Sequence, residues 1–283
     1  MTIELTLFEG RVGDHNDLAM LGARSLAMAI SDLLGIEPTV IGRPEPALNA
    51  NWDIELMQAR PALQQLQARF QNIYSRGDRA ISATSRCAAS IATLPMVALH
   101  HPEAYVVWFD AHADLNTPES TTTGYLGGLA LSASLGLWES GFGNGLSLKN
   151  VVLVGQRDMD PFEVDLMQQR NIAHVRPGPD IESRLRAAIA GRPVYVHLDC
   201  DVLNPGIVPT DYVHEGGLSL DDLRSACNTI ADSKVIGVEI AEFQNSWEPG
   251  GEPVSPRQLL GALVPLFRRL QSSCPDPSAF SVL

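Results

Sequence analysis

Short apolar runs alternate along the chain with longer stretches in which apolar residues recur every three or four positions. The short runs are typical of buried strands, and the longer stretches are typical of helices with one apolar side. Strands are predicted at 3–8, 38–41, 79–84, 105–109, 151–154, 172–175, 194–198 and 235–240. Helices are predicted at 16–34, 53–74, 87–100, 161–170, 181–190, 220–231 and 256–272, with Pro61 as a possible break in the second.

This alternation indicates βαβ units, and therefore an α/β fold with an eight-stranded, mostly parallel sheet. No repeat, charge run or low-complexity linker divides residues 1–283, so we expect a single domain. Segments 44–50 and 248–251 contain Pro and Gly and are expected to be surface loops. In sheets of this kind ligands bind beyond the carboxyl ends of the strands, which directs attention to the residues that follow each strand.

Two acidic strings follow predicted buried strands: Asp110, His112 and Asp114 after 105–109, and Asp199 and Asp201 after 194–198. Alternate residues share one face of an extended chain, so each string is expected to present its polar side chains together. Carboxylates crowded beside apolar segments repel one another and lose solvation unless a positive charge lies among them. Four carboxylates and one imidazole suit a hard divalent cation such as Mn²⁺.

A simpler interpretation exists for each string alone, because Asp after a strand is often a turn residue or a helix N-cap. Two such strings at the ends of two buried strands favour the metal site. Two further strand ends carry polar residues, at 155–160 and 239–242, and all four segments are expected to face one cleft.

The chain has 33 Asp and Glu against 20 Lys and Arg, a formal charge of −13. This excess argues against nucleic acid or an anionic membrane as a partner and leaves small molecules, with a homo-oligomer still open. The four cysteines show no CxxC spacing and no disulfide density, which favours a reducing cytoplasm. No leader pattern and no apolar stretch of bilayer length occurs, so we expect a cytoplasmic protein.

The strings DAHADLNTP, RDMDPFE, LDCDVLNP and EIAE occur in this order over most of the chain. Together they resemble the arginase or ureohydrolase family. The resemblance implies a three-layer α/β/α fold with an eight-stranded parallel sheet. It also implies hydrolysis of guanidino-type C–N bonds with a pair of Mn²⁺ ions bridged by hydroxide.

By this resemblance Asp110 and Asp199 would each bridge both metals. Asp114 would complete one site, and His112 with Asp201 would complete the other. The resemblance therefore implies metal ligands on both acidic strings.

The same resemblance implies a substrate pocket for a guanidino amino acid. Glu242 would face the guanidinium group, and Asp160 would receive the α-amino group. Asn116 and Thr123 stand where arginine-specific members hydrogen-bond the α-carboxylate. The amino-acid end of the pocket is therefore expected to be intact.

Cys87 is the first departure from the family pattern, because it stands 23 residues before Asp110, where the family places a metal-binding His. A neutral imidazole suits Mn²⁺ better than a thiol, which must lose its proton before it ligates. We therefore expect one or two Mn²⁺ per chain, with the site at Cys87 weakened. The alternative is that Cys87 is a small buried apolar residue without a metal contact.

The second departure lies in the loop 121–128, where Gly127 replaces a proton-relaying His and Tyr125 replaces a smaller polar residue. Loss of a positioned acid–base group costs a factor of about a hundred to ten thousand, so a substrate other than ordinary arginine is indicated. Among the other histidines, only His214 follows the second acidic string closely enough to reach the cleft; it is otherwise a solvated loop residue.

An intact amino-acid end with weakened metal and proton groups favours Nω-hydroxy-L-arginine, whose guanidine is less basic than that of arginine. The departures are similar to those of the hydroxyurea-forming branch of the family, which serves antibiotic biosynthesis. The expected products are L-ornithine and hydroxyurea. Asp201, or a metal-linked water, would carry the proton to the leaving nitrogen, and Asp201 and Glu242 are the expected catalytic residues.

Three alternatives remain at this point. The first is a ureohydrolase that acts on another guanidino or formimino amino acid. The second is a hydrolase with a single metal, since Asp110, His112 and Asp199 resemble the mononuclear site of deacetylases with the same architecture. The third is a catalytically silent homologue that binds an amino acid or a partner subunit. Metal analysis separates the third from the others, because a cluster of buried carboxylates without a metal only destabilises a fold.

Overall fold

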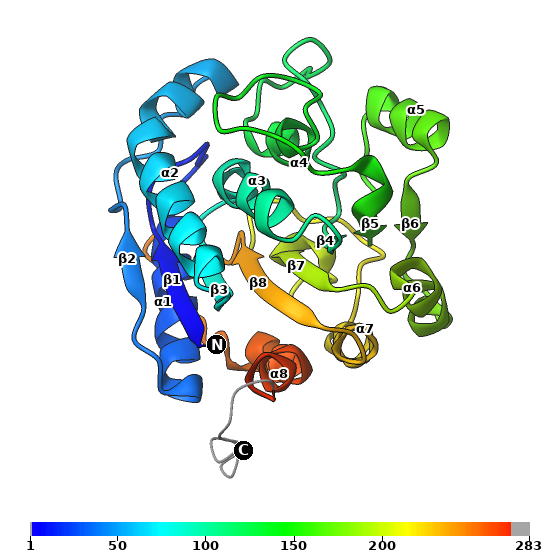
Figure 1. The fold of residues 1–283 in the computed structure, drawn as a ribbon. Helices are drawn as coiled ribbons and strands as arrows, with labels where there is room; N and C mark the ends of the chain where they lie inside the picture. The colour runs from blue at the N-terminus through cyan, green and yellow to red at the C-terminus, as the bar shows by residue number, and fades with distance from the viewer. Residues whose placement is uncertain (1, 273–283) are drawn as a thin grey trace.

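A computed structural model describes residues 2–272. Its eight strands form one sheet in the order β2-β1-β3-β8-β7-β4-β5-β6, and every pairing between them is parallel (Figure 1). The strands are β1 (Ile3–Phe8), β2 (Thr39–Ile41), β3 (Arg79–Thr84), β4 (Tyr105–Phe109), β5 (Val151–Val154), β6 (Ala173–Val175), β7 (Val194–Asp199) and β8 (Val235–Ala241). The α/β architecture predicted from the apolar pattern is confirmed.

The α-helices of the described residues are α1 (Leu18–Leu34), α2 (Trp52–Ser75), α3 (Ser90–His100), α4 (Ala130–Ser134), α5 (Pro161–Arg170), α6 (Ile181–Ile189), α7 (Leu220–Ala231) and α8 (Arg257–Gln271). Pro61 lies inside α2 and does not end it, so the break considered there does not occur; the residue is exposed. The helix predicted at 87–100 begins as a 3-10 turn over Cys87–Ala89. Helix α4 was not predicted, because it is too short to show a helical period.

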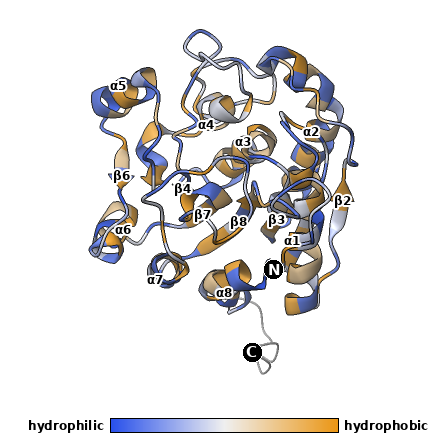
Figure 2. Cartoon of the chain, turned by 180° about the vertical axis from the view of Figure 1, so that it is seen from behind, coloured by the Kyte–Doolittle hydropathy of each residue, from blue (hydrophilic) through white to orange (hydrophobic). Residues whose placement is uncertain are grey.

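Helices cover both faces of the sheet. One apolar core packs α1, α6, α7 and α8 against one face, and a second core packs α2, α3, α4 and α5 against the other. Strand β4 illustrates the division, because Val107 and Phe109 belong to the first core while Val106 and Trp108 belong to the second. Figure 2 shows hydrophobic and hydrophilic residues mixed along the helices, as expected for helices that cover a sheet with one side.

The sheet order places β3, β8, β7 and β4 side by side at the centre. Because parallel strands end at the same edge, the segments that follow these strands meet there. The described cysteines, Cys87, Cys200 and Cys227, are free and buried, and Cys274 lies outside the described residues. In the described part of the chain, no helix has the length and apolar character needed to cross a bilayer.

Candidate active site

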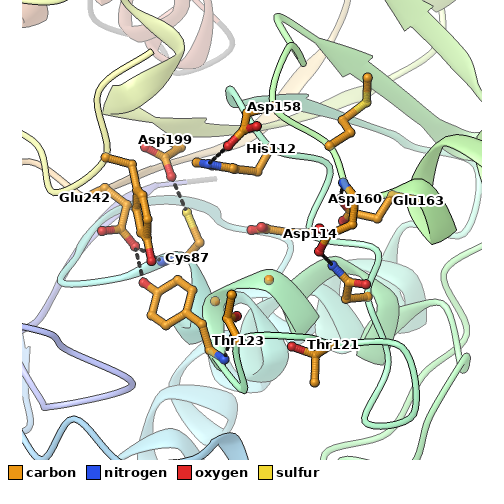
Figure 3. Close-up of a pocket in the computed structure, with 16 residues that line it drawn as sticks. Cys87, His112, Asp114, Thr121, Thr123, Asp158, Asp160, Glu163, Asp199 and Glu242 are labelled. Carbon is orange, nitrogen blue, oxygen red and sulfur yellow. Dashed lines mark hydrogen bonds and ion pairs between the residues drawn. The ribbon is translucent and has the colours of Figure 1, made fainter.

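A pocket of about 160 Å³ lies at the carboxyl edge of the central strands. Residues from four neighbouring strand ends line it: Cys87 after β3, Glu242 after β8, Asp199 at the end of β7 and Asp114 after β4. Figure 3 shows Cys87, Asp199 and Glu242 on one side of this pocket and Asp160 on the other, with Asp114 between them. The four segments that were expected to share one cleft do so, because 110–114, 155–160, 199–201 and 239–242 all contribute lining residues, and the end of β3 is a further one that was not among them.

The first acidic string turns sharply instead of continuing as an extended strand. Asp110 Oδ1 accepts a hydrogen bond of 2.7 Å from the backbone N–H of His112, and Asp114 has a φ of +52°. The extended geometry predicted for this string is therefore wrong. The turn folds the His112 ring back onto Asp110, with 3.2 Å between Nδ1 and Oδ1.

The second string also turns, through a 3-10 helix over Cys200–Val202. Asp199 caps this helix, since its Oδ1 accepts the backbone N–H of Asp201 at 2.7 Å. The extended geometry predicted here is likewise wrong. Asp201 in turn reaches the first string: Oδ1 accepts the N–H of Ala111 at 2.9 Å, and Oδ2 lies 3.0 Å from His112 Nδ1. Asp199 therefore caps a turn, as the simpler interpretation predicts, and Asp201 also brings its carboxylate close to the first string.

Burial and mutual repulsion hold several of these carboxylates in their protonated form. Burial, followed by the charge of Asp201, raises the pKa of Asp110 from 3.8 to about 7. Burial, followed by neighbouring carboxylates, raises the pKa values of Asp114 and Asp199 well above the usual value. Such shifts show that the positive charge in the cluster does not balance its carboxylates, and a bound cation would reverse them.

His112 supplies the positive charge present in this cluster. Burial alone would lower the pKa of His112, but hydrogen bonds and charges from Asp110 and Asp201 outweigh burial and raise it strongly. Burial raises the pKa of Asp201, but the hydrogen bond and charge of His112, together with the N–H of Ala111, outweigh burial and the net pKa is lowered. A protonated imidazole therefore occupies a position from which a neutral imidazole could bind a metal.

The described residues offer several groups whose ligand atoms lie within 4.8 Å of one another. One group joins Asp110, His112 and Asp201, and another joins Cys87, Asp199 and Glu242. Asp114 lines the pocket but belongs to neither group. The first group contains only carboxylate and imidazole donors, and both of its carboxylates are buried, which fits a hard divalent cation. The arginase family is metal-dependent, and this donor set is consistent with that property.

Cys87 lies within the second group. Its Sγ is 3.1 Å from Asp199 Oδ2, and its side chain is 2% exposed. Burial, followed by the charges of Asp199 and Glu242, raises the pKa of the Cys87 thiol well above its usual value. Without a cation the thiol therefore stays protonated and donates to the carboxylate.

His197 is a residue that the sequence interpretation left within a strand without a role. Its Nε2 lies 3.2 Å from Cys87 Sγ, and its Nδ1 lies 2.9 Å from Glu239 Oε1. The ring also stacks on Trp108, at 3.5 Å between ring centres, and the indole N–H donates to Asp110 Oδ2 at 3.0 Å. His197 is therefore linked to both acidic strings, through Cys87 to Asp199 and through Trp108 to Asp110. It alternates with Asp199 along β7, which was the available signal.

Arg86 was also missed, and it places a positive charge beside Glu242. Its side chain is fully buried, and its guanidinium contacts Glu242 at 2.8 Å, Asp211 at 2.9 Å and Asp14 at 3.0 Å. Burial raises the pKa of Glu242, against the lowering effect of Arg86. Glu242 Oε1 also accepts the N–H of Cys87 at 2.9 Å. The carboxylate is thus fixed in orientation at the pocket wall.

The residues assigned to the amino-acid end of a substrate lie on the other side of the pocket. Asn116 Nδ2 donates to Asp160 Oδ2 at 2.7 Å, and both residues line the pocket together with Thr123. Asp160 also begins α5, where its backbone N–H donates to Glu163 Oε2 at 2.9 Å. The hydrogen bonds of Asp160 thus fix one carboxylate at the pocket wall.

Tyr125 occupies the space above Gly127. A Cβ on Gly127 would lie 2.4 Å from the Tyr125 ring, which is closer than real contacts allow. His214 lies nearer the mouth of the site, with Nε2 3.4 Å from Asp158 Oδ2 and its ring centre 5.0 Å from that of His112. The loop of His214 therefore reaches the edge of the site, whereas the space beside Gly127 holds a phenol ring.

Backbone strain is concentrated at this site. Five non-glycine residues in the described part of the chain have a positive φ, and two of them are Asp114 (+52°) and Glu242 (+65°). Residues in this region are costly and persist where the surrounding structure requires them, often at functional sites. The backbone conformations of Asp114 and Glu242 are an observation separate from their charges, and both observations indicate this pocket as the functional site.

Comparisons with known proteins agree with this geometry. A model of the arginase family matches residues 14–253. The N(omega)-hydroxy-L-arginine amidinohydrolase of Streptomyces lavendulae is 37% identical over 241 residues, which cover 85% of this chain and 88% of that protein. An arginase of Schizosaccharomyces pombe is 32% identical over 171 residues, 54% of this chain and 53% of that protein.

Among solved structures, Entamoeba histolytica arginase in complex with L-ornithine has a TM-score of 0.81 at 21% identity, covering 94% of this chain and 97% of that one. This likeness shows the arginase fold. The chain therefore belongs to the arginase family. Within that family it is an amidinohydrolase, an enzyme that hydrolyses the C–N bonds of amidines.

Proposed function

We propose that this amidinohydrolase converts Nω-hydroxy-L-arginine and water to L-ornithine and hydroxyurea, with Mn²⁺ as its metal. The observation that carries the proposal is at position 127, where Gly stands in place of the family's relay His and the Tyr125 ring fills the space above it. The 37% identity to a hydroxyarginine amidinohydrolase supports the same substrate. A role in antibiotic biosynthesis and a cytoplasmic location belong to this proposal.

The acidic strings are the proposed metal ligands, with Asp110, Asp114 and Asp199 joined by His112 and Asp201. Cys87 is the proposed sulfur ligand at the weaker site. When bound by these residues, a divalent cation would supply the charge that lowers the pKa of a water molecule for attack on the guanidino carbon. The raised pKa of Asp110, about 7, supports this assignment because the charge of His112 does not balance the carboxylates around it.

The remaining pocket residues bind and orient the substrate. Glu242, fixed by Arg86 and by the N–H of Cys87, accepts hydrogen bonds from the guanidino group. Asp160 and Asn116 bind the α-amino and α-carboxylate groups, as does Thr123. Asp201, which Ala111 N–H holds in place, carries the proton toward the departing ornithine nitrogen. N-hydroxylation makes the guanidine less basic, so more of it is neutral and open to attack.

The test is an assay of the purified protein with hydroxyarginine and arginine in parallel, with Mn²⁺ added and urea and hydroxyurea measured separately. We expect hydroxyurea and ornithine in equal amounts, little urea from arginine, and loss of turnover after exhaustive chelation. Asp110→Asn or Asp199→Asn is expected to abolish turnover. Efficient urea release from arginine would favour an ordinary arginase instead, and no product from either substrate would contradict the proposal.

A further inference from the structure

The Tyr125 ring has a defined position in the pocket wall. It lies 4.5 Å from the His15 ring and 5.8 Å from the Tyr212 ring, measured between ring centres. Its third neighbour is the backbone of Gly127, where a Cβ would lie 2.4 Å from Cε1 and 2.9 Å from the hydroxyl oxygen. The ring can therefore lie here only because residue 127 has no side chain.

This position brings the Tyr125 hydroxyl to the guanidinium-facing carboxylate, at 3.5 Å from Glu242 Oε1. Arg86 donates to Oε2 of Glu242 and the N–H of Cys87 donates to Oε1, so the carboxylate is held in place and keeps acceptor positions for a substrate. Burial, followed by the charge of Glu242, raises the pKa of Tyr125 well above its usual value, so the hydroxyl keeps its proton. The pocket wall beside Glu242 thus carries a group that both donates and accepts hydrogen bonds.

A guanidinium group and an N-hydroxyguanidine differ in what they offer this hydroxyl. All the nitrogen-bound groups of a guanidinium are donors, and none accepts. An N-hydroxyl group adds an oxygen that accepts a hydrogen bond and also donates one. A site built to hydrogen-bond a substrate hydroxyl discriminates strongly against the analogue that lacks it.

We infer that Tyr125 is a specificity residue that binds the N-hydroxyl group of the substrate beside Glu242, and that Gly127 provides the space for its ring. This inference rests on the proposed function and adds a residue that selects hydroxyarginine over arginine. Tyr125 and Gly127 then act as one unit, since the second determines where the first can lie.

The main test compares wild type with Tyr125→Phe, which removes the hydroxyl and keeps the ring. We expect kcat/KM for hydroxyarginine to fall about threefold to tenfold, as for loss of one hydrogen bond. Arginine, measured as a substrate or as a competitive inhibitor, should change less than about twofold, because it has no N-hydroxyl partner to lose. The matched control is Tyr105→Phe, at the start of β4 beside Arg192 and absent from the pocket lining; it should leave both values unchanged.

The outcomes separate this inference from the proposed function. Wild type that forms no hydroxyurea overturns both. If wild type forms hydroxyurea, two results would overturn only the role of Tyr125. In the first, Tyr125→Phe has no more effect than Tyr105→Phe; in the second, it lowers kcat/KM by the same factor for both substrates.

A double-mutant cycle tests the link to Gly127. Gly127→Ala should displace the ring and lower kcat/KM for hydroxyarginine at least as far as Tyr125→Phe does. In a protein that already carries Tyr125→Ser, which removes the ring, Gly127→Ala should lower kcat/KM for hydroxyarginine only slightly further. The effects of substitutions at two residues that share one space are not additive. Additive losses would overturn the role of Gly127.

Discussion

The Cys87 sulfur has an acidic neighbour and a basic neighbour at hydrogen-bonding distance, Asp199 Oδ2 at 3.1 Å and His197 Nε2 at 3.2 Å. This environment bears on the two interpretations of Cys87, as a residue that only packs or as a metal ligand. A thiol packed in an apolar core needs no such partners, whereas a metal-binding thiolate benefits from an imidazole that fixes its orientation. Because the two interpretations predict different metal contents, substitutions at this position distinguish them.

Cys87→His is expected to restore a nitrogen ligand and to raise the metal content per chain at matched Mn²⁺. Cys87→Ser should lower occupancy of the same site and spare the one built from His112 and Asp201. Metal analysis of the three proteins after gel filtration checks this, with thermal unfolding as a control for folding. Identical stoichiometry in all three would mean that Cys87 only packs. Gain of metal need not bring arginase activity, since the space beside Gly127 still lacks an imidazole.

Asp160 has a proposed binding role and a structural role, and two substitutions separate them. Asp160→Asn keeps a good N-cap for α5 but loses the charge, whereas Asp160→Ala loses both and costs about 1 kcal/mol of stability. Both should raise KM for substrates with an α-amino group and change kcat less, because the contact is remote from the reacting carbon. Steady-state kinetics with a guanidine that lacks the α-amino group provides the control. An equal rise in KM for that compound would argue against the assigned contact.

The residues that sequence reasoning missed share a physical cause. Asp199 was found because acidic residues follow an apolar strand, which is a local signal, whereas Cys87 and Glu242 received their roles from the resemblance to the arginase family. His197 and Arg86 act through partners more than sixty positions away, such as Cys87 and Glu242, and nothing local indicates such partners. Their roles depend on tertiary packing, which one sequence without an alignment does not reveal.

At the scale of elements, the apolar pattern predicted every strand of the described sheet, because buried parallel strands are apolar on both faces. The segments beyond the strands were less predictable. Asp110 and Asp199 both accept backbone N–H groups two residues later, so each string turns where an extended chain was expected. Asp competes with strand geometry in this way through its own side chain.

Arg86 joins three segments at the carboxyl edge of the sheet, through Asp14, Asp211 and Glu242. Replacing it by Gln leaves buried carboxylates without a counterion, which should lower the free energy of unfolding by roughly 3–5 kcal/mol. Denaturant unfolding of the chelated protein measures this. Arg186→Gln is the control, because its ion pair with Asp232 is exposed and should contribute less than about 1 kcal/mol. Similar losses for both variants would contradict the structural role of Arg86.

At the scale of the whole molecule, the acidic cluster makes stability depend on pH and on metal together. The folded-state pKa of Asp110 is about 7 against 3.8 in the unfolded chain, and those of Asp114 and Asp199 are raised in the same direction. A carboxyl group whose pKa is higher in the folded state stabilises the protein fully at pH values below its unfolded-state pKa. This stabilisation is lost as the pH rises through the folded-state pKa. Asp201 has a lowered pKa and acts oppositely, but only in the more acidic range.

The chelated protein is therefore expected to lose stability from these groups as pH rises from about 4 to above 7. A bound divalent cation replaces the protons, so the gain in Tm on adding Mn²⁺ should increase between about pH 5.5 and pH 8. Mn²⁺ at a hundredfold excess over its Kd contributes about 2.7 kcal/mol, or roughly 5–10 °C. Thermal unfolding with Mn²⁺ or chelator across this range measures the gain. Asp199→Asn should show a smaller gain in Tm on adding Mn²⁺, and this gain should vary less with pH. A wild-type gain in Tm that is constant across the range would show that these carboxylates do not bind the metal.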